Sequence, residues 1–310
     1  MTPIDAVKKA KNVLIVCHIR PDGDCLGSGF ALMRIAEKLG KKVDFVCDSP
    51  FPPAYSFIKD HEKLNEIKCD SYDLAIAVDC ADSARMGSFG EAFRKCPETI
   101  NIDHHKTNDR FGKVNFVVPD LSSTCELLYS LIKNDNVIGA DEATDLYLGL
   151  STDTGNFMHS NTTPDTLTTA SELLALGADL SMIVNGFYRN NTKNKLALIS
   201  RAIASMQYFD DDKVAVITVK KSDLEETGCV LSDTEGLIDY AMSVGSVKVA
   251  VCMTEQRERS YKVSLRSKGA DVSIVAGYFG GGGHKQASGC VANGYYEDVL
   301  EKIVRLSSGN

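Results

Sequence analysis

The first third of the chain contains four short apolar runs, and this pattern is the strongest constraint on the fold. The runs are "NVLIVC" (12–17), "KVDFVC" (42–47), "DLAIAVD" (73–79) and "TINID" (99–103). Between the first two lies "GSGFALMRIAEKLG", whose apolar residues recur at helical spacing. Strands that are apolar on both faces and alternate with helices are typical of a parallel sheet that helices cover on both sides. The pattern therefore predicts an α/β fold.

The rest of the chain changes character twice. Helical periodicity dominates residues 123–200, and strand-like runs such as "KVAVITV", "VKVAVCMTE" and "SYKVSLRSK" follow. A chain of 310 residues is long enough for two domains. We expect an N-terminal parallel-sheet domain with flanking helices and, across a cleft, a smaller C-terminal α/β domain. The expected boundaries are 1–188 for the first domain, 189–204 for a helical linker and 205–310 for the second domain.

Potential metal ligands follow three of the early strands. His18 comes directly after the first run, Asp79 ends the third, and Asp103 ends the fourth and precedes His104 and His105. In an open parallel sheet the binding crevice lies beyond the carboxyl ends of the strands, so these side chains are expected at one edge. Taken singly, an Asp at a strand end is more often a helix cap or a turn former.

Three further carboxylates are expected at the same edge. The loop "HIRPDGDCLGS" adds Asp22 and Asp24, and "GLSTDTGNF" adds Asp153 in a helical region. "PDGD" by itself is a common turn. The coincidence of all these groups favours a site for divalent cations, because carboxylates gathered without cations repel one another and raise each other's pKa.

Composition excludes several other classes of protein. The formal charge of −8 argues against a protein that holds long nucleic acid through a broad basic surface. The apolar run near the N-terminus is too short to span a membrane and lacks the layout of a signal peptide. The ten cysteines are scattered and include no CxxC pair, so we expect reduced thiols in a cytoplasmic protein.

Five segments together identify a resemblance. "HIRPDGD", "VDCAD", "IDHHKTN" and "STDTGNF", in that order, resemble the four motifs of the DHH phosphoesterase family, and "FGGGGHKQASG" (279–289) resembles the signature of its DHH-associated C-terminal domain. The chain is most similar to those members that are oligoribonucleases and also phosphatases. The resemblance implies a Mn²⁺-dependent phosphoesterase that degrades single-stranded RNA of a few nucleotides to mononucleotides. It also implies removal of the 3′-phosphate from 3′-phosphoadenosine-5′-phosphate (pAp).

The same resemblance implies roles for the site residues. Two divalent cations would be held, with Mn²⁺ expected and Mg²⁺, Co²⁺ or Fe²⁺ as substitutes. The implied ligands of one cation are His18, Asp22 and Asp79, and those of the other are Asp24, Asp79, His104 and Asp153. Asp79 would bridge the two cations and so take part in catalysis. Asp103 would orient a neighbouring imidazole, and His105 would contact the substrate phosphate or the leaving oxygen.

The resemblance also implies a substrate-binding role for five residues of the C-terminal domain. A run of glycines can be only a flexible loop, but glycines before a His also let a phosphate approach the backbone closely. Arg266 can be read as a solvated charge at a strand edge; in the resembling enzymes the matching Arg and Ser belong to the substrate site. The residues expected to bind substrate beside His105 are Arg266, Ser267, Gly282, Gly283 and His284.

Several alternatives stay open at this point. The nearest is a stand-alone phosphodiesterase for cyclic di-AMP or its linear product, because the catalytic motifs are shared. A family II inorganic pyrophosphatase is disfavoured by the "GGGGH" segment, and a long-strand exonuclease would need further nucleic-acid-binding modules. A binding protein without catalysis is disfavoured because every expected ligand position is filled. The sequence does not decide whether the chain forms a homodimer.

Overall fold

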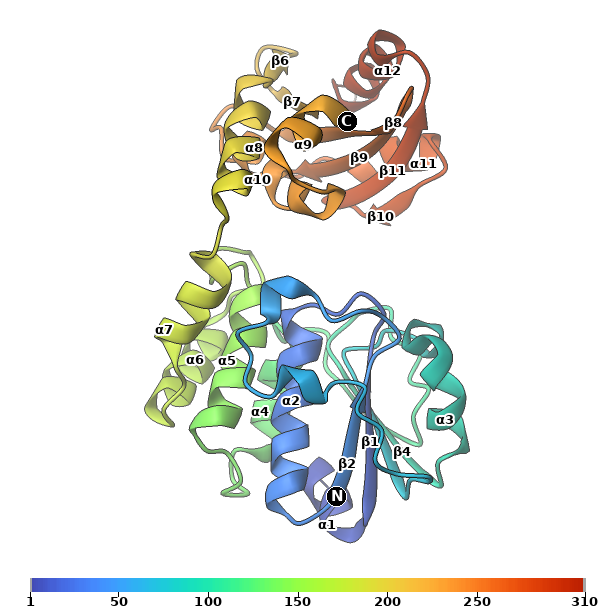
Figure 1. The fold of residues 1–310 in the computed structure, drawn as a ribbon, viewed down its shortest axis with the longest axis vertical. Coiled ribbons are helices and arrows are strands. Elements are labelled where there is room, and N and C mark those ends of the chain that lie inside the picture. The colour runs from blue at the N-terminus through green and yellow to red at the C-terminus, as the bar shows by residue number, and fades with distance from the viewer. Residues whose placement is uncertain (1, 309–310) are drawn as a thin grey trace. The chain divides into compact units, whose positions relative to one another are not determined.

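The computed structural model describes residues 2–308 and divides into two compact units, 1–190 and 191–310 (Figure 1). Both units are α/β, as the sequence predicts. The first is built on a parallel sheet and the second on a mixed sheet.

The first unit contains a five-stranded, fully parallel sheet in the order β2-β1-β3-β4-β5. The first four strands coincide with the four apolar runs of the sequence. The strands are β1 (Asn12–Cys17), β2 (Lys42–Val46), β3 (Leu74–Val78), β4 (Glu98–Asp103) and β5 (Val114–Val117). Because all five run the same way, their carboxyl ends share one edge of the sheet.

Helices cover both faces of this sheet. Val13, Ile15 and Cys17 of β1 face a core that includes side chains of α2, α4 and α5, whereas Leu14 and Val16 face Met86 and Phe93. The helices of the unit are α1 (Pro3–Lys9), α2 (Gly23–Lys38), α3 (Gly90–Lys95), α4 (Thr124–Ile132), α5 (Ala140–Asp153), α6 (Pro164–Ala175) and α7 (Leu180–Ile183). Short 3₁₀ and π turns complete it: η1 (Pro53–Tyr55), η2 (His61–Lys63), η3 (Ser83–Phe89) and η4 (Val184–Tyr188).

Glycines allow α2, α4 and α5 to approach closely. A β-carbon on Gly27 of α2 would lie 2.3 Å from the backbone oxygen of Asp145. A β-carbon on Gly149 of α5 would lie 2.2 Å from the sulfur of Cys125 and 2.8 Å from Oδ1 of Asp24. Since no side chain fits at either position, the helix ends that carry the predicted ligands are held against one another.

The second unit contains a six-stranded sheet in the order β10-β11-β9-β8-β7-β6, in which only β7 and β8 are parallel to each other. The strands are β6 (Gln207–Phe209), β7 (Val214–Val219), β8 (Val249–Arg257), β9 (Ser260–Ser267), β10 (Gly282–His284) and β11 (Ala287–Asn293). Its helices are α8 (Lys193–Ala204), α9 (Lys221–Thr227), α10 (Leu237–Met242), α11 (Val272–Tyr278) and α12 (Tyr296–Ser308), with the 3₁₀ turn η5 (Leu231–Thr234).

Helix α8 covers most of the segment for which we expected a linker. Leu198, Ile199 and Ala202 are buried in one core cluster with Ile217 of β7 and Leu237 of α10. Because this apolar face packs on the second sheet, α8 is grouped with the second unit.

Within residues 2–308, no single helix is both long and apolar enough to cross a membrane. One bent pair of helices, Pro164–Ala175 with Leu180–Tyr188, passes that test by length and composition alone.

Candidate metal centre

The structure brings the predicted ligands of the first unit together at the carboxyl edge of its sheet. His18 follows β1, Asp79 follows β3, and His104 and His105 follow β4. The helix ends supply the rest: Asp22 and Asp24 lie at the start of α2, and Asp153 ends α5. Among the described residues, three groups have ligand atoms close enough to hold an ion: His18, Asp22 and Cys25; Asp79, His104 and His105; and Asp24, His104 and Asp153.

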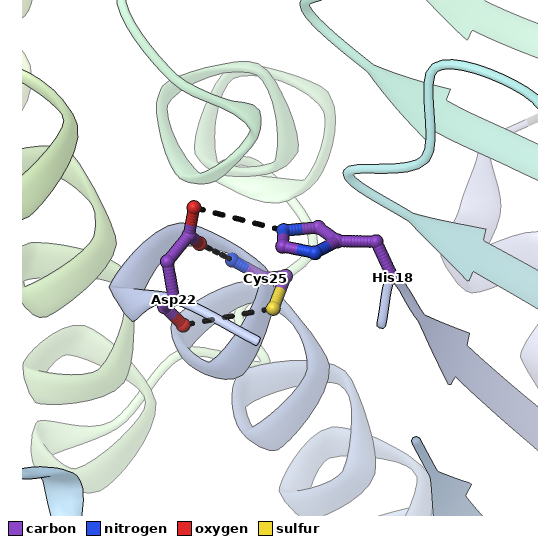
Figure 2. A group of neighbouring side chains, drawn as sticks. All are labelled: His18, Asp22 and Cys25. Atoms are coloured by element: carbon purple, nitrogen blue, oxygen red, sulfur yellow. Dashed lines mark hydrogen bonds and ion pairs between the residues drawn. The ribbon is translucent and has the colours of Figure 1, made fainter. Parts of the chain in front are cut away.

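The imidazole of His18 is buried and fixed in one tautomer. Its Nδ1 lies 2.8 Å from the backbone oxygen of Ile19, and because a carbonyl only accepts, Nδ1 carries the proton. In the neutral ring Nε2 then presents a lone pair, which faces Oδ2 of Asp22 at 3.6 Å (Figure 2). The same nitrogen lies 3.4 Å from Oδ2 of Asp79. A lone pair that faces two carboxylates needs a cation between them or a proton on the ring.

His104 repeats this arrangement on the other side of Asp79. Its Nδ1 donates to the backbone oxygen of Leu121 at 3.2 Å, which again leaves Nε2 for a cation. Nε2 lies 3.4 Å from Oδ2 of Asp153, 3.8 Å from Oδ1 of Asp79 and 3.9 Å from Oδ2 of Asp24. Two imidazoles of the same tautomer thus face the two different oxygens of one carboxylate, Asp79.

Asp79 adopts a conformation that few residues tolerate. Its φ is 58°, in the left-handed region, where Asp and Asn are enriched among the residues other than glycine. Its backbone N–H donates to Ile102 at 3.0 Å, and its Oδ1 accepts from the hydroxyl of Thr124 at 2.9 Å. The side chain is only 2% exposed. Backbone strain that persists in a buried polar residue is a common mark of a functional site.

Asp24 is buried against the N-terminus of α4. Its Oδ2 accepts from the backbone N–H of Thr124 at 2.6 Å, and its Oδ1 accepts from that of Cys125 at 2.9 Å. Burial, followed by the charges of Asp79 and Asp153, raises the pKa of Asp24 well above its usual value. Burial likewise raises the pKa of Asp153 to about 7, although His104 lowers it in part.

The two imidazoles respond to the same excess of negative charge. Burial lowers the pKa of His104, but Asp24, Asp79 and Asp153 outweigh it and raise the pKa to about 9. The pKa of His18 is raised as well, since its neighbours outweigh the effect of burial. The donor set is therefore short of positive charge, and divalent cations fit it because they supply that charge and use the free Nε2 lone pairs.

His105 is oriented differently from its neighbour His104. Its Nδ1 donates to Oδ1 of Asp103 at 2.7 Å, while Asn108 donates to Oδ2 of that carboxylate at 2.5 Å. Asp103 is fully buried, which by itself raises its pKa, but the hydrogen bond and charge of His105 together with the hydrogen bond from Asn108 outweigh burial and lower the pKa. The bond to Asp103 raises the pKa of His105. Asp103 thus fixes this imidazole and favours its protonated form.

Sequence reasoning missed three contributors to the site. Thr124 donates hydrogen bonds to both Asp24 and Asp79, and Asn108 donates one to Asp103. The sulfur of Cys25 lies within 4.8 Å of the ligand atoms of His18 and Asp22. The segment around Thr124 carries the signal of a helix start, because Ser123 accepts from the N–H three residues on. That signal reveals the helix but not which carboxylates its free N–H groups contact.

The residues predicted to bind substrate in the second unit lie near one edge of its sheet. Gly282, Gly283 and His284 form β10, Arg266 and Ser267 end β9, and β11 pairs with both strands. The hydroxyl of Ser267 donates to the backbone oxygen of Ala270 at 2.6 Å. Gly283 has a φ of 142°, and a β-carbon there would lie 2.6 Å from the backbone oxygen of Ala287. The backbone at this point therefore requires glycine.

The carboxyl edge of this parallel sheet carries two sets of histidine and carboxylate donors, which share the carboxylate of Asp79. This arrangement defines a candidate metal-dependent hydrolase. The comparisons with known proteins agree with this class. The model of the DHH family, N-terminal domain, matches residues 12–150, and that of the DHHA1 domain matches residues 211–308. The chain belongs to the DHH family of phosphoesterases, and the resemblance seen in the sequence is confirmed.

Three similar proteins match nearly the whole chain. The bifunctional oligoribonuclease and PAP phosphatase NrnA of Thermus thermophilus is 33% identical, over 94% of this chain and 89% of the relative. The protein of the same name from Bacillus subtilis is 28% identical, over 94% and 92%. An exopolyphosphatase-related protein from Bacteroides fragilis has a solved structure with 26% identity and a TM-score of 0.90, over 99% of this chain and 95% of that one.

Proposed function

We propose that this chain is a metal-dependent phosphoesterase that degrades short single-stranded RNA to mononucleotides and removes the 3′-phosphate from pAp. Two relatives that match almost the full length are named as oligoribonuclease and PAP phosphatase, which supports this choice of substrates. The ten cysteines are all free thiols, which supports a reducing compartment such as the cytoplasm.

One observation carries the proposal of two cations. Oδ2 of Asp79 lies 3.4 Å from Nε2 of His18, and Oδ1 lies 3.8 Å from Nε2 of His104. Both nitrogens are the unprotonated ones of their neutral rings, since each Nδ1 donates to a backbone carbonyl. A carboxylate with one imidazole lone pair at each oxygen is suited to bridge two cations.

The distances from each imidazole to the carboxylates around it support the ligand sets proposed from the sequence. One set is His18, Asp22 and Asp79, and the other is Asp24, Asp79, His104 and Asp153. We expect Mn²⁺, with Mg²⁺, Co²⁺ or Fe²⁺ as substitutes, because the donors are oxygen and imidazole nitrogen. When bound, such ions would activate water and stabilise charge on the phosphoryl oxygens.

His105 and Asp103 are proposed to act on the substrate. Since Nδ1 of His105 is engaged by Asp103, Nε2 is the nitrogen left for a phosphate or a leaving oxygen. The raised pKa of His105 favours the imidazolium, which can donate a hydrogen bond to the phosphate and a proton to the leaving alkoxide.

In the second unit we propose that five residues bind the rest of the substrate: Arg266, Ser267, Gly282, Gly283 and His284. The exposed Gly282–His284 strand offers backbone that a phosphate can approach closely, and Arg266 provides an exposed positive charge.

The test is a comparison of initial rates with Mn²⁺ on a labelled RNA dinucleotide, pAp, cyclic di-AMP and pyrophosphate. Rapid turnover of the first two, with mononucleotide and AMP as products, is expected. Preferential turnover of cyclic di-AMP would contradict the proposal and indicate that the preferred substrate is a cyclic dinucleotide. The matched control is Asp165→Asn, which alters an exposed carboxylate in the first turn of α6 and should leave all four rates unchanged.

A further inference from the structure

We propose that Cys25 is a sulfur donor to the ion held by His18 and Asp22, and that it makes this ion position selective for thiophilic metals such as Co²⁺ and Zn²⁺. The inference rests on the proposed function, because it assumes that an ion is bound between His18, Asp22 and Asp79. It goes beyond that function by adding a ligand and a metal preference.

The position of the thiol is the first observation. The ligand atoms of His18, Asp22 and Cys25 all lie within 4.8 Å of one another, and Figure 2 shows the three side chains together at the start of α2. Cys25 is fully buried, and its Sγ lies 3.6 Å from the backbone oxygen of Asp22. The sulfur therefore lies on the buried side of the proposed ion position.

An independent observation shows that this position is built for an ion. The side chain of His18 is 5% exposed, and its Nε2, which carries the lone pair of the neutral ring, faces the carboxylates of Asp22 and Asp79 at 3.6 and 3.4 Å. Both separations exceed a hydrogen bond and match two ligands of a common cation. Cys25 adds a sulfur to the nitrogen of His18 and the carboxylate of Asp22, and the carboxylate of Asp79 faces the same nitrogen; Zn²⁺ and Co²⁺ accept such mixed donors.

The sulfur changes which metals the position prefers. Thiolate favours soft and borderline ions, whereas Mg²⁺ and Mn²⁺ gain little from it. On binding, a metal–sulfur bond forms, the S–H bond breaks and its proton passes to solvent, so no oxidant or reductant is needed. The second ion position has only His104 and carboxylates as proposed ligands. The two positions should therefore differ in metal preference.

Cys125 provides a matched control. It is buried like Cys25, and its Sγ lies 3.5 Å from the backbone oxygen of Asp24, much as that of Cys25 lies near Asp22. Within residues 2–308, however, it belongs to none of the groups with ligand atoms close enough to share an ion. Cys125→Ser removes a thiol beside the centre without removing a donor.

The test is absorption spectroscopy of the metal-free chain titrated with Co²⁺. A sulfur-to-cobalt charge-transfer band in the near ultraviolet is expected for the parent chain and for Cys125→Ser, and its loss is expected for Cys25→Ser and Cys25→Ala. In competition titrations the Cys25 variants should lose Zn²⁺ affinity by more than the roughly 10- to 100-fold that outer hydrogen-bond partners contribute. Their Mn²⁺ affinity should stay unchanged.

The outcomes separate this inference from the proposed function. Cobalt ligand-field bands without a sulfur band in the parent chain would overturn the role of Cys25 and leave the two-ion site intact. A sulfur band that persists in both Cys25 variants would also overturn it. Failure to bind Co²⁺ or Mn²⁺ at all would instead refute the metal site itself, and with it the proposed function. Circular dichroism of each variant verifies the fold.

Discussion

Replacing Asp79 by asparagine tests the shared carboxylate with little damage to the fold. The φ of 58° costs an ordinary residue about 1–2 kcal/mol, but Asn tolerates this conformation as Asp does. The new amide keeps an oxygen that can accept the hydroxyl of Thr124. Loss of the charge removes repulsion from Asp24 and also attraction to the two imidazoles, and these effects oppose each other. We expect the free energy of unfolding to change by less than about 1 kcal/mol.

Asp79→Ala is the contrasting variant, and its cost can be worked from the same contacts. Alanine loses the hydrogen bond from Thr124, worth about 1 kcal/mol, and the tolerance of the left-handed conformation, worth about 1 kcal/mol more. The free energy of unfolding should therefore be about 2 kcal/mol lower for the alanine variant than for the asparagine variant. Urea denaturation of the metal-free proteins measures this difference.

Activity should fall steeply in both variants. Ions at such a site stabilise the transition state by several kcal/mol, and about 4 kcal/mol corresponds to a thousandfold change in rate. We expect kcat/KM on an RNA dinucleotide to fall by about that factor. Calorimetry should find fewer than two Mn²⁺ per chain. A folded Asp79→Asn protein that binds two Mn²⁺ and turns over normally would refute the bridging role.

Three further predictions follow from the site. His105→Ala should lower kcat by about 100-fold or more and leave the number of bound Mn²⁺ unchanged, because a general acid contributes about that much; loss of Mn²⁺ binding would make His105 a ligand instead. The pKa of Asp153 is raised from 3.8 to about 7, so the metal-free folded state holds an extra proton and loses stability as pH rises through that range. Mn²⁺ should consequently raise Tm more at about pH 8 than at about pH 6, and an equal rise at both would contradict the assignment. Arg266→Ala and His284→Ala should raise KM for the dinucleotide with kcat and Mn²⁺ binding preserved, whereas unchanged KM in both would remove the second unit from substrate binding.

The sequence was sufficient to locate the edge of the sheet where the site lies. The runs that became β1, β3 and β4 are mostly apolar and buried, so the His or Asp that ends or follows each of them falls at the carboxyl edge of a parallel sheet. This argument needs only local patterns. It also supports the adjacent positions of His104 and His105, one of which can face the ions while the other faces the substrate.

Other features depend on contacts between distant segments and could not be predicted. The hydroxyl and N–H of Thr124 contact Asp79 and Asp24, which lie 45 and 100 residues away in the sequence. Cys25 reads as a core residue because it lies in a helix that is buried on nearly all sides. The left-handed conformation of Asp79 has no sequence signal either, since Asp at a strand end is common in turns.

Exposure divides the carboxylates of the site into two kinds, and this division indicates how the substrate approaches. The side chains of Asp24 and Asp79 are 1% and 2% exposed and receive hydrogen bonds from Thr124, so the protein holds them in place before any ion binds. The side chains of Asp22 and Asp153 are 52% and 30% exposed. His105 is also 30% exposed, so water and phosphate can reach the centre where these outer residues are exposed. If Asp24 and Asp79 hold the ions from the buried side and Asp22 and Asp153 complete their coordination from the exposed side, the substrate phosphate would bind beside His105, as the proposed reaction requires.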